Sequence, residues 1–276
     1  MSRRGASTAY LAWPAVAVLT VLFLVPLAAV LAISVTDPQP GLGNYRLLLE
    51  SRASQAIFLK TAQIGVIVTL LATAFGYLIA FAMIHGQRRW QTVILAGVLI
   101  PLWSSVLIRA FAWVTLLRSN GLVNQALMAA GIVDMPLELM RNDVGVVIGM
   151  VHVMIPLATL PIYSVMRGID RRLVSAARTL GASETRAMLE VFAPLTLPGV
   201  AAAAVLVFVT SIGFYVIPAV LGGGKTVMIA EYIEVQINST LRWGLGTMLA
   251  AVLLAAVGCL FAIGARIPAL RQRYGG

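Results

Sequence analysis

The sequence predicts an all-α integral membrane protein with six transmembrane helices. Its 276 residues are 60% hydrophobic and only 11% charged, and the mean hydropathy is +0.95. A soluble domain carries about a quarter charged residues, so this composition indicates a chain that is solvated mainly by lipid. Because unpaired backbone groups are costly in lipid, each spanning segment is expected to be a helix. We expect residues 1–276 to form a single transmembrane domain.

The first apolar run extends from Tyr10 to about Ile33 and follows Arg3 and Arg4. A signal peptide also begins with basic residues, but its hydrophobic core is only about 7 to 15 residues long. The run here matches the roughly 20 residues that cross a bilayer, so we interpret it as a retained first span. The segment Asp37–Ser54 is then an external loop.

Five further apolar runs have the length of a membrane span. They lie near Thr61–Ile84, Val93–Leu117, Val144–Val165, Gly199–Leu221 and Gly246–Ala265. Gly145 and Gly149 form a GxxxG spacing in one of them, which permits close helix contact.

The basic residues predict the orientation, since cytoplasmic segments carry an excess of arginine and lysine. With the N-terminus inside, the inner segments hold three acids and twelve arginines, a net charge of +9. The outer segments hold seven basic and seven acidic residues. Both termini are therefore expected in the cytoplasm, and the formal charge of +10 does not require a nucleic-acid partner. The inner arginines are Arg3, Arg4, Arg88, Arg89, Arg167, Arg171, Arg172, Arg178, Arg186, Arg266, Arg271 and Arg273.

No catalytic or metal-binding pattern is visible in the sequence. Cys259 is the single cysteine and lies in an apolar run, and no cluster of cysteines and histidines has metal-ligand spacing. No nucleophile stands beside a base in a known pattern, so we expect no enzymatic activity and no metal site. Gly224-Lys225-Thr226 looks like the end of a phosphate-binding loop, but Ala219 stands where the first glycine would be.

The longest polar interruption on the predicted inner side is the stretch Ser175–Val200. A helix is expected up to Leu180, followed by a break at Gly181, which can adopt the left-handed backbone that ends a helix. Ser183 can cap the next helix. That second, amphipathic helix would carry Met188, Leu189 and Phe192 and end at Pro194 and Pro198. Such a pair of short helices could be an ordinary amphipathic loop or could dock into a soluble partner.

The stretch resembles the EAA loop of ABC-transporter permeases. The matching residues are Ala176, Ala177, Leu180, Gly181, Ala182, Ser183 and the ending Leu197-Pro198-Gly199. In that family the loop inserts into a groove of the ATPase subunit and transmits its closure. The resemblance implies a cytoplasmic coupling loop over residues 168–192, with the ATPase-coupling residues Ser175, Ala176, Ala177, Arg178, Leu180, Gly181, Ala182, Ser183 and Glu184.

One departure from the family pattern concerns its leading glutamate, which is Ser175 here. An ion pair made by that glutamate must then be absent, or replaced through Arg178 or Glu184.

A narrower resemblance, to the spermidine/putrescine branch of the permease family, covers about residues 44–270. It rests on Pro101–Trp113, Asn120–Asn124, Met135–Leu137 and Phe214–Gly223. The branch also contains permeases for other small polar solutes. The resemblance implies a type I ABC importer permease fold (MetI-like) and a solute that is a polyamine or a related small polar organic compound.

The same resemblance implies the partners. They are a second permease subunit, two ATPase subunits and an external solute-binding protein, in the bacterial plasma (inner) membrane. ATP and Mg would bind on the ATPase subunits, and no cofactor is expected in this chain.

Several residues are candidates for the substrate path. Arg109 lies in an apolar span, where a charge at the helix centre costs at least about 2.5 kcal/mol unless it faces a partner or a cavity. It could line the path, or it could reach the interface or backbone carbonyls.

Four aromatic residues could attract an organic cation. They are Trp103, Trp113, Phe214 and Tyr215. For the two tryptophans an interfacial aromatic belt is an equal alternative. Tyr215 lies near Pro218 and the Gly222–Gly224 turn, where irregular backbone is expected.

Acidic residues are absent from the six spans as drawn, and Ala219 stands where several family members have an acid. Glu231 and Glu234 are the nearest acids and lie three apart, on one helical face. They could line an outer vestibule, but we favour an orientation toward water or the binding protein.

Two other classes of protein remain as alternatives. A secondary transporter usually needs intramembrane acids and paired repeats, and neither is evident here. A membrane-embedded hydrolase would need a catalytic pair. Persistence of transport after ATP depletion would favour the secondary transporter.

Overall fold

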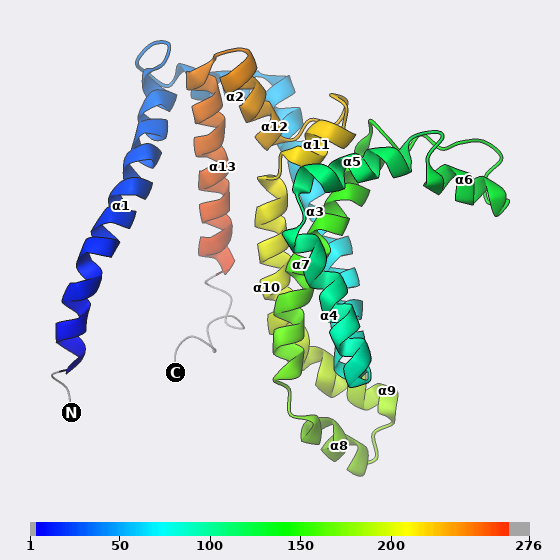
Figure 1. Cartoon of the computed structure of the whole chain (residues 1–276). Helices are drawn as coiled ribbons and strands as arrows, with labels where there is room; N and C mark the ends of the chain where they lie inside the picture. Colours follow the sequence, from blue (N-terminus) through cyan, green and yellow to red (C-terminus); the bar gives the residue numbers. More distant parts are fainter. Residues whose placement is uncertain (1–3, 265–276) are drawn as a thin grey trace. The chain divides into compact units, whose positions relative to one another are not determined.

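The computed structural model describes residues 4–264, and within that range all the regular structure is helical (Figure 1). Six described segments are long and apolar enough to cross a membrane. The prediction of an all-α protein with six spans is therefore confirmed. The segments are Trp13–Thr36, Arg52–His85, Val106–Ala129, Asp143–Arg167, Glu184–Ile212 and Trp243–Ala262.

The chain divides into two compact units, the first of which comprises residues 1–55 and 232–260. It contains α1 (Arg4–Thr36), α2 (Gly43–Glu50), a π-helical turn (Val235–Ser239) and most of α13 (Trp243–Gly264). The 18-residue apolar window of α1 has no buried residue.

Polar bonds at the end of α1 hold the first unit together. Asn44 Nδ2 donates to the carbonyl oxygens of Ser34 and Asp37, at 3.1 and 2.7 Å. The carboxylate of Asp37 accepts from the backbone N–H of Gly244, near the start of α13, at 2.6 Å. Asp37 therefore joins the segment after α1 to the first turn of α13.

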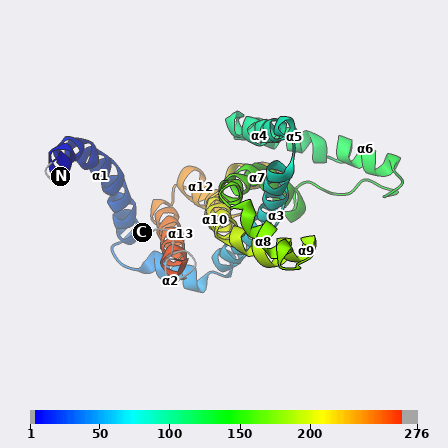
Figure 2. The ribbon, with the colours of Figure 1, turned by 90° about the horizontal axis from the view of Figure 1, so that it is seen from below.

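Among the described residues, the second unit comprises residues 56–231 and 261–264. Its helices are α3 (Arg52–His85), α4 (Arg88–Trp103), α5 (Val106–Leu117), α6 (Leu122–Ala129), α7 (Asp143–Arg167), α8 (Arg171–Thr179), α9 (Glu184–Ala187), a π-helical turn (Met188–Phe192), α10 (Ala193–Ile212), α11 (Val216–Leu221) and α12 (Ile229–Glu234). Figures 1 and 2 show several of its helices beside α7, whereas α6 extends away from α7.

Helix α7 is the centre of the second unit and buries residues around its whole circumference. Neighbouring helices can approach α7 closely where small residues lie at the contact. A Cβ atom added to Gly199 of α10 would lie 2.9 Å from the Cβ of Val165. One added to Gly149 of α7 would lie 2.6 Å from a methyl group of Leu221 in α11. The close contact expected from the GxxxG spacing is confirmed for Gly149.

The third predicted span, Val93–Leu117, is not one continuous helix. It is divided into α4 and α5 at Ser104 and Ser105, whose ψ angles of 149° and 135° are extended. Pro101 lies in the last turn of α4, and its carbonyl accepts from Ser104 N in a tight turn at 3.3 Å. Proline favours a local ending because it lacks an N–H and crowds the preceding turn.

The predicted ends of two other helices are also wrong. The helix that begins after Ser183 does not stop at Pro194 or Pro198 but continues through the π-helical turn into α10 and ends at Ile212. The fifth predicted span, Gly199–Leu221, is accordingly interrupted at Gly213–Tyr215, before α11. Pro194 occupies the first turn of α10, where a missing N–H is tolerated.

The predicted orientation is not tested by the fold. Of the inner arginines, Arg3, Arg266, Arg271 and Arg273 and the side chain of Arg4 lie outside the described residues, as does Ala265 at the end of the sixth predicted span.

Substitution of Gly199 by alanine should destabilise the protein, because the new methyl group would meet Val165 at 2.9 Å. We expect a loss of about 1–3 kcal/mol, as for other overpacked cores. The measurement is the midpoint of unfolding of the purified chain in detergent.

Gly97 provides the matched control, because it lies within α4 and a Cβ atom there would meet nothing within 4 Å. Gly97→Ala should be neutral or stabilising by up to about 1 kcal/mol, from helix propensity alone. Equal midpoints for the two variants would contradict the assigned contact between α7 and α10.

Candidate functional site

The polar stretch predicted to couple to a partner forms a bent pair of short helices at the end of α7 (Figures 1 and 2). The first helix, α8, is capped by Asp170, whose carboxylate accepts from Arg172 N at 2.9 Å. It ends at Thr179, and Gly181 follows with φ = +95°. Ser183 Oγ then accepts from Arg186 N at 3.3 Å and caps α9. The predicted break at Gly181 and cap at Ser183 are both confirmed.

Gly181 is required at the bend by its backbone conformation. Its positive φ is strained for any residue with a Cβ atom, although the space around it is open. The bond from Ala182 N to Ala177 O, at 3.1 Å, and that from Gly181 N to Arg178 O, at 3.0 Å, complete the turn. Backbone geometry rather than side-chain packing therefore defines the bend.

Large apolar side chains project from this loop. Leu180 is 89% exposed and Leu189 is 66% exposed. Large exposed apolar side chains on a polar loop are typical of an interaction surface. An ion pair between Arg186 and Glu190, at 2.9 Å, supports the helix one turn before the spanning part of α10.

The remaining predicted coupling residues, Ser175, Ala176, Ala177 and Arg178, lie on α8, and Glu184 is the first residue of α9. The Ser175 hydroxyl donates to Arg171 O within its own helix at 3.3 Å. Among the described residues, neither Arg178 nor Glu184 forms an ion pair in place of the family's glutamate. The predicted coupling role of these residues stays a prediction.

Two of the predicted path residues, Arg109 and Trp113, come together with His152 between α5 and α7. The rings of Trp113 and His152 are 5.5 Å apart and meet edge to face. Nε and Nη1 of Arg109 and Nδ1 of His152 are buried, and none has a hydrogen-bond partner among the described residues. An arginine that reached the interface or backbone carbonyls would have these nitrogens solvated or bonded. The geometry therefore favours an inward-facing Arg109.

The other aromatic candidates do not form one surface. Trp103, the last residue of α4, is 92% exposed, which agrees with an interfacial position better than with a path. Phe214 packs against the core beside α11, whereas Tyr215 is 40% exposed. The irregular backbone expected near Tyr215 is confirmed, since residues 213–215 are not helical and Gly223 and Gly224 have positive φ.

Glu231 corrects an expectation, because it is only 8% exposed and does not face water. It lies in α12, directly after the buried residues Met228 and Ile229. Glu234, at the end of α12, is partly exposed, and its carboxylate accepts from Asn238 Nδ2 at 3.4 Å.

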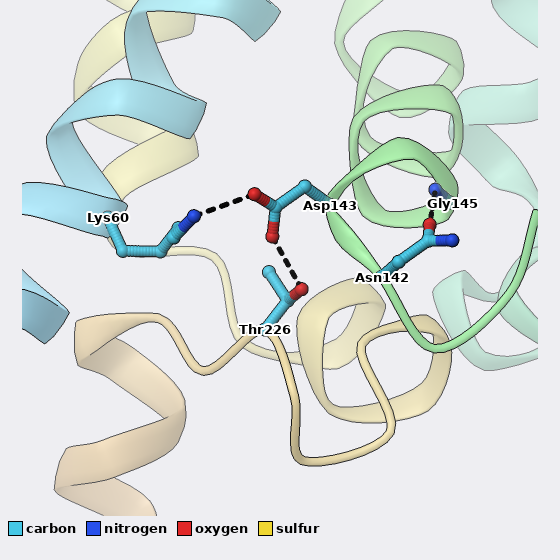
Figure 3. Close-up of polar contacts among 5 residues, drawn as sticks. All are labelled: Lys60, Asn142, Asp143, Gly145 and Thr226. Atoms are coloured by element: carbon cyan, nitrogen blue, oxygen red, sulfur yellow. Dashed lines mark hydrogen bonds and ion pairs between the residues drawn. The ribbon is translucent and has the colours of Figure 1, made fainter.

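A polar cluster that the sequence did not predict lies at the opposite end of α7 from the loop (Figure 3). The carboxylate of Asp143 accepts from Lys60 Nζ and from Thr226 Oγ1, both at 2.7 Å. Asn142 caps the same helix end and accepts from Gly145 N at 3.0 Å. Asp143 therefore joins α3, α7 and the α11–α12 connection. We call Lys60, Asp143 and Thr226 the outer clasp, after the side on which the sequence predicts them.

Two backbone bonds strengthen the same connection. Ile229 N donates to Thr61 Oγ1 at 2.8 Å, and Arg141 N donates to Leu221 O at 2.8 Å. Thr226 belongs to the sequence that looks like the end of a phosphate-binding loop, but its hydroxyl is only 1% exposed and is bonded to a carboxylate. Its surroundings suit a structural contact and do not suit a phosphate.

Removing the Thr226 hydroxyl should weaken the outer clasp. Thr226→Val keeps the shape of the side chain but loses a hydrogen bond to a carboxylate, at a cost of about 1.5 kcal/mol. The ion pair contributes less, up to about 1 kcal/mol, because the side chains of Lys60 and Asp143 are 35% and 45% exposed. Unfolding midpoints in detergent provide the measurement.

Thr92→Val is the control for this experiment, because its exposed hydroxyl bonds only to the backbone of its own helix. Its effect should stay within about 0.5 kcal/mol. If Thr226→Val were no more destabilising than Thr92→Val, the clasp would not contribute to the fold.

Comparisons with known proteins agree with this architecture. A family model described as "Binding-protein-dependent transport system inner membrane component" matches residues 72–266. The chain is 30% identical over 204 residues to a spermidine/putrescine transport system permease protein of Haemophilus influenzae, covering 74% of this chain and 71% of that protein. It is 29% identical over 222 residues to the protein of the same name from Salmonella typhimurium (strain SL1344), covering 80% and 77%.

Among solved structures, the chain is similar to one from a bacterial alginate ABC transporter in complex with an alginate pentasaccharide-bound periplasmic protein. The TM-score is 0.75 at 16% identity, covering 97% of this chain and 96% of that chain. At this identity the likeness concerns the fold, which is the ABC importer permease fold (MetI-like).

Proposed function

The chain belongs to the family of binding-protein-dependent transport system inner membrane components, and from that membership we propose that it couples ATP hydrolysis on a separate subunit to import of a small polar solute. It is a multi-pass protein of the bacterial inner membrane and a permease subunit of an ABC importer.

The observation that carries the proposal is the bent loop at the end of α7. Gly181 and Ser183 define the bend between α8 and the helix that begins with α9, and the loop exposes Leu180 and Leu189. A rigid bend with exposed apolar side chains can enter a groove of a soluble partner. The partner is an ATPase subunit, which carries the ATP and Mg, and this chain binds no cofactor of its own.

Coupling follows from a difference in affinity. If the ATP-bound ATPase pair favours one position of the loop, it favours the permease conformation connected to that position. In the assembly we propose, two ATPase subunits bind the loops of this chain and of a second permease. Closure of the ATPase pair draws the loops together and opens the path toward an external solute-binding protein, and hydrolysis restores the inward-facing state.

For the solute we propose a polyamine, such as spermidine or putrescine, or a related small organic compound. The names of the relatives from Haemophilus influenzae and Salmonella typhimurium support this class. Trp113, Tyr215 and the partly exposed Glu234 could attract an organic cation. The inward-facing Arg109 would instead suit a polar or anionic group on the solute, so a compound with both amino and acidic groups is the second candidate.

The bend is tested by Gly181→Val. A β-branched residue is strained at φ = +95°, so the loop should lose its shape while the six spans still insert. In proteoliposomes that contain the full complex, we expect ATP hydrolysis to continue while solute uptake falls at least about tenfold, a change equivalent to about 1.4 kcal/mol. Gly97→Val provides the control, and normal uptake by Gly181→Val would contradict the assigned coupling turn.

Partner binding is tested by Leu180→Asp, which places a charge at the most exposed apolar residue of the loop. We expect the purified permease to lose its ATPase subunit on co-purification. Leu122→Asp changes an equally large exposed side chain, 65% exposed, on α6, and should retain the ATPase. Retention of the ATPase by Leu180→Asp would overturn the docking surface.

The solute is tested with the external binding protein of the same complex. Calorimetric titration with spermidine, putrescine, an aminoalkyl phosphonate and an oligosaccharide should give the tightest binding for the polyamines. Preference for the phosphonate would support the second candidate, and preference for the oligosaccharide would reject both.

A further inference from the structure

The inner end of the second unit contains a hollow of about 380 Å³ that lies apart from the exposed tips of the loop. It is enclosed by the last turns of α3 and α7, the first turn of α4, and the segments from α8 to the π-helical turn. We propose that this hollow binds the phosphate headgroup of an anionic phospholipid.

The charges around the hollow favour an anion. Arg167, Arg171 and Arg178 line it, and Glu184 is the one acid among the lining residues. Arg171 Nη2 donates to the carbonyl of Ile84, the penultimate residue of α3, at 2.8 Å, so its guanidinium is fixed at the rim. Guanidinium groups bind phosphate with two parallel hydrogen bonds, which suits this arrangement.

Arg167 and Arg178 retain their donors. Neither forms a salt bridge or a side-chain hydrogen bond with another described residue, in contrast to Arg186 in the same loop, which is paired with Glu190. With three arginines and one glutamate in its lining, the hollow therefore keeps a net positive charge within the described part of the chain.

The floor of the hollow is apolar. Ile84, Tyr163, Met166, Met188 and Phe192 line it. Phe192 packs edge to face on His85 and on Phe81, with ring centroids 5.9 and 6.2 Å apart. A free phosphate ion has no group that could use such a floor, whereas the glycerol and first acyl carbons of a phospholipid do. The combination of cationic rim and apolar floor thus indicates an amphipathic anion.

The position of the hollow also favours lipid. His85 and Arg167 are the final residues of two spanning helices, so the hollow lies where these helices leave the hydrocarbon. Trp90, which is 54% exposed and has Arg89 over its ring at 5.9 Å, lies in the adjacent first turn of α4. Tryptophan and arginine at this depth are typical of the headgroup region, and basic pockets between helices there bind anionic headgroups.

The lipid site shares Ser175, Arg178 and Glu184 with the predicted coupling residues, but not the exposed leucines. Leu180 and Leu189, the apolar side chains that we assign to ATPase docking, are not among the residues lining the hollow. A bound headgroup would join α8 to the ends of α3 and α7, and so would stabilise the position of the loop.

The test uses the full chain in nanodiscs of phosphatidylcholine with increasing phosphatidylglycerol, read out by native mass spectrometry of retained lipid. The variant is Arg167→Gln/Arg178→Gln. The control is Arg52→Gln/Arg118→Gln, which removes the same charge at two exposed arginines away from the hollow. We expect wild type and control to retain phosphatidylglycerol at least about tenfold more strongly than the variant, from the loss of charge-assisted hydrogen bonds.

Two further arms separate the possible anions. Millimolar inorganic phosphate should not displace the lipid, and displacement would show a site for a soluble anion and overturn the proposal. Addition of the ATPase subunit should leave retained phosphatidylglycerol unchanged, and displacement by the ATPase would assign the hollow to an acidic segment of that partner. Equal retention of phosphatidylglycerol by the variant and the control would also overturn the proposed lipid site. Unfolding midpoints of the wild type, the variant and the control verify that all three proteins are folded.

Discussion

The close packing of α7 against its neighbours is the constraint on which the second unit depends. Gly149 and Gly199 let α11 and α10 approach α7 to distances that a single added methyl group would not permit. In lipid there is little hydrophobic drive between helices, so such van der Waals contact supplies much of the association. The helix has 25 residues and is therefore roughly 37 Å long. It carries the outer clasp at one end and the bent loop at the other.

That arrangement gives a physical basis for coupling across the membrane. If the proposed ATPase partner displaced the loop, the displacement would act on Arg167, the last residue of α7. Asp143, the first residue of α7, bonds to both Lys60 and Thr226. Because packed interfaces change between discrete arrangements and do not deform continuously, a well-packed α7 moves as a body. The loop and the α11–α12 connection are thus attached to the two ends of one rigid element.

Much of the fold could be predicted from local sequence. Apolar runs of about 20 residues identify spans because lipid imposes both length and helical structure on them. The bend at Gly181 and the cap at Ser183 were predictable because each rests on the backbone preference of one residue. The division of α4 from α5 had a local signal in Pro101, but the unbroken path through Pro194 and Pro198 did not. Pro194 is tolerated because it falls beside a π-helical turn and at the start of α10. Pro198 lies inside α10, and no local signal marks it as compatible with a helix.

The contacts of the candidate site were less accessible to sequence reasoning. Lys60 and Asp143 are 83 residues apart, as are Asp143 and Thr226, so no spacing rule relates them. The only local signal was the Asn142-Asp143 pair, which is typical of a helix start. The burial of Glu231 likewise depends on the surrounding helices and not on its own neighbours in sequence. Arg109 was recognisable as unusual, but its nearness to Trp113 and His152 required the fold.

Helix α1 differs from every other span in having no buried residue in its apolar window. Within its own unit, the polar contacts of Ser34, Asn44 and Asp37 fix only its end. Packing inside its own unit therefore leaves the depth and tilt of α1 open to the thickness of the bilayer. A membrane of different thickness would therefore shift this helix first, while leaving the internal packing of α7 intact.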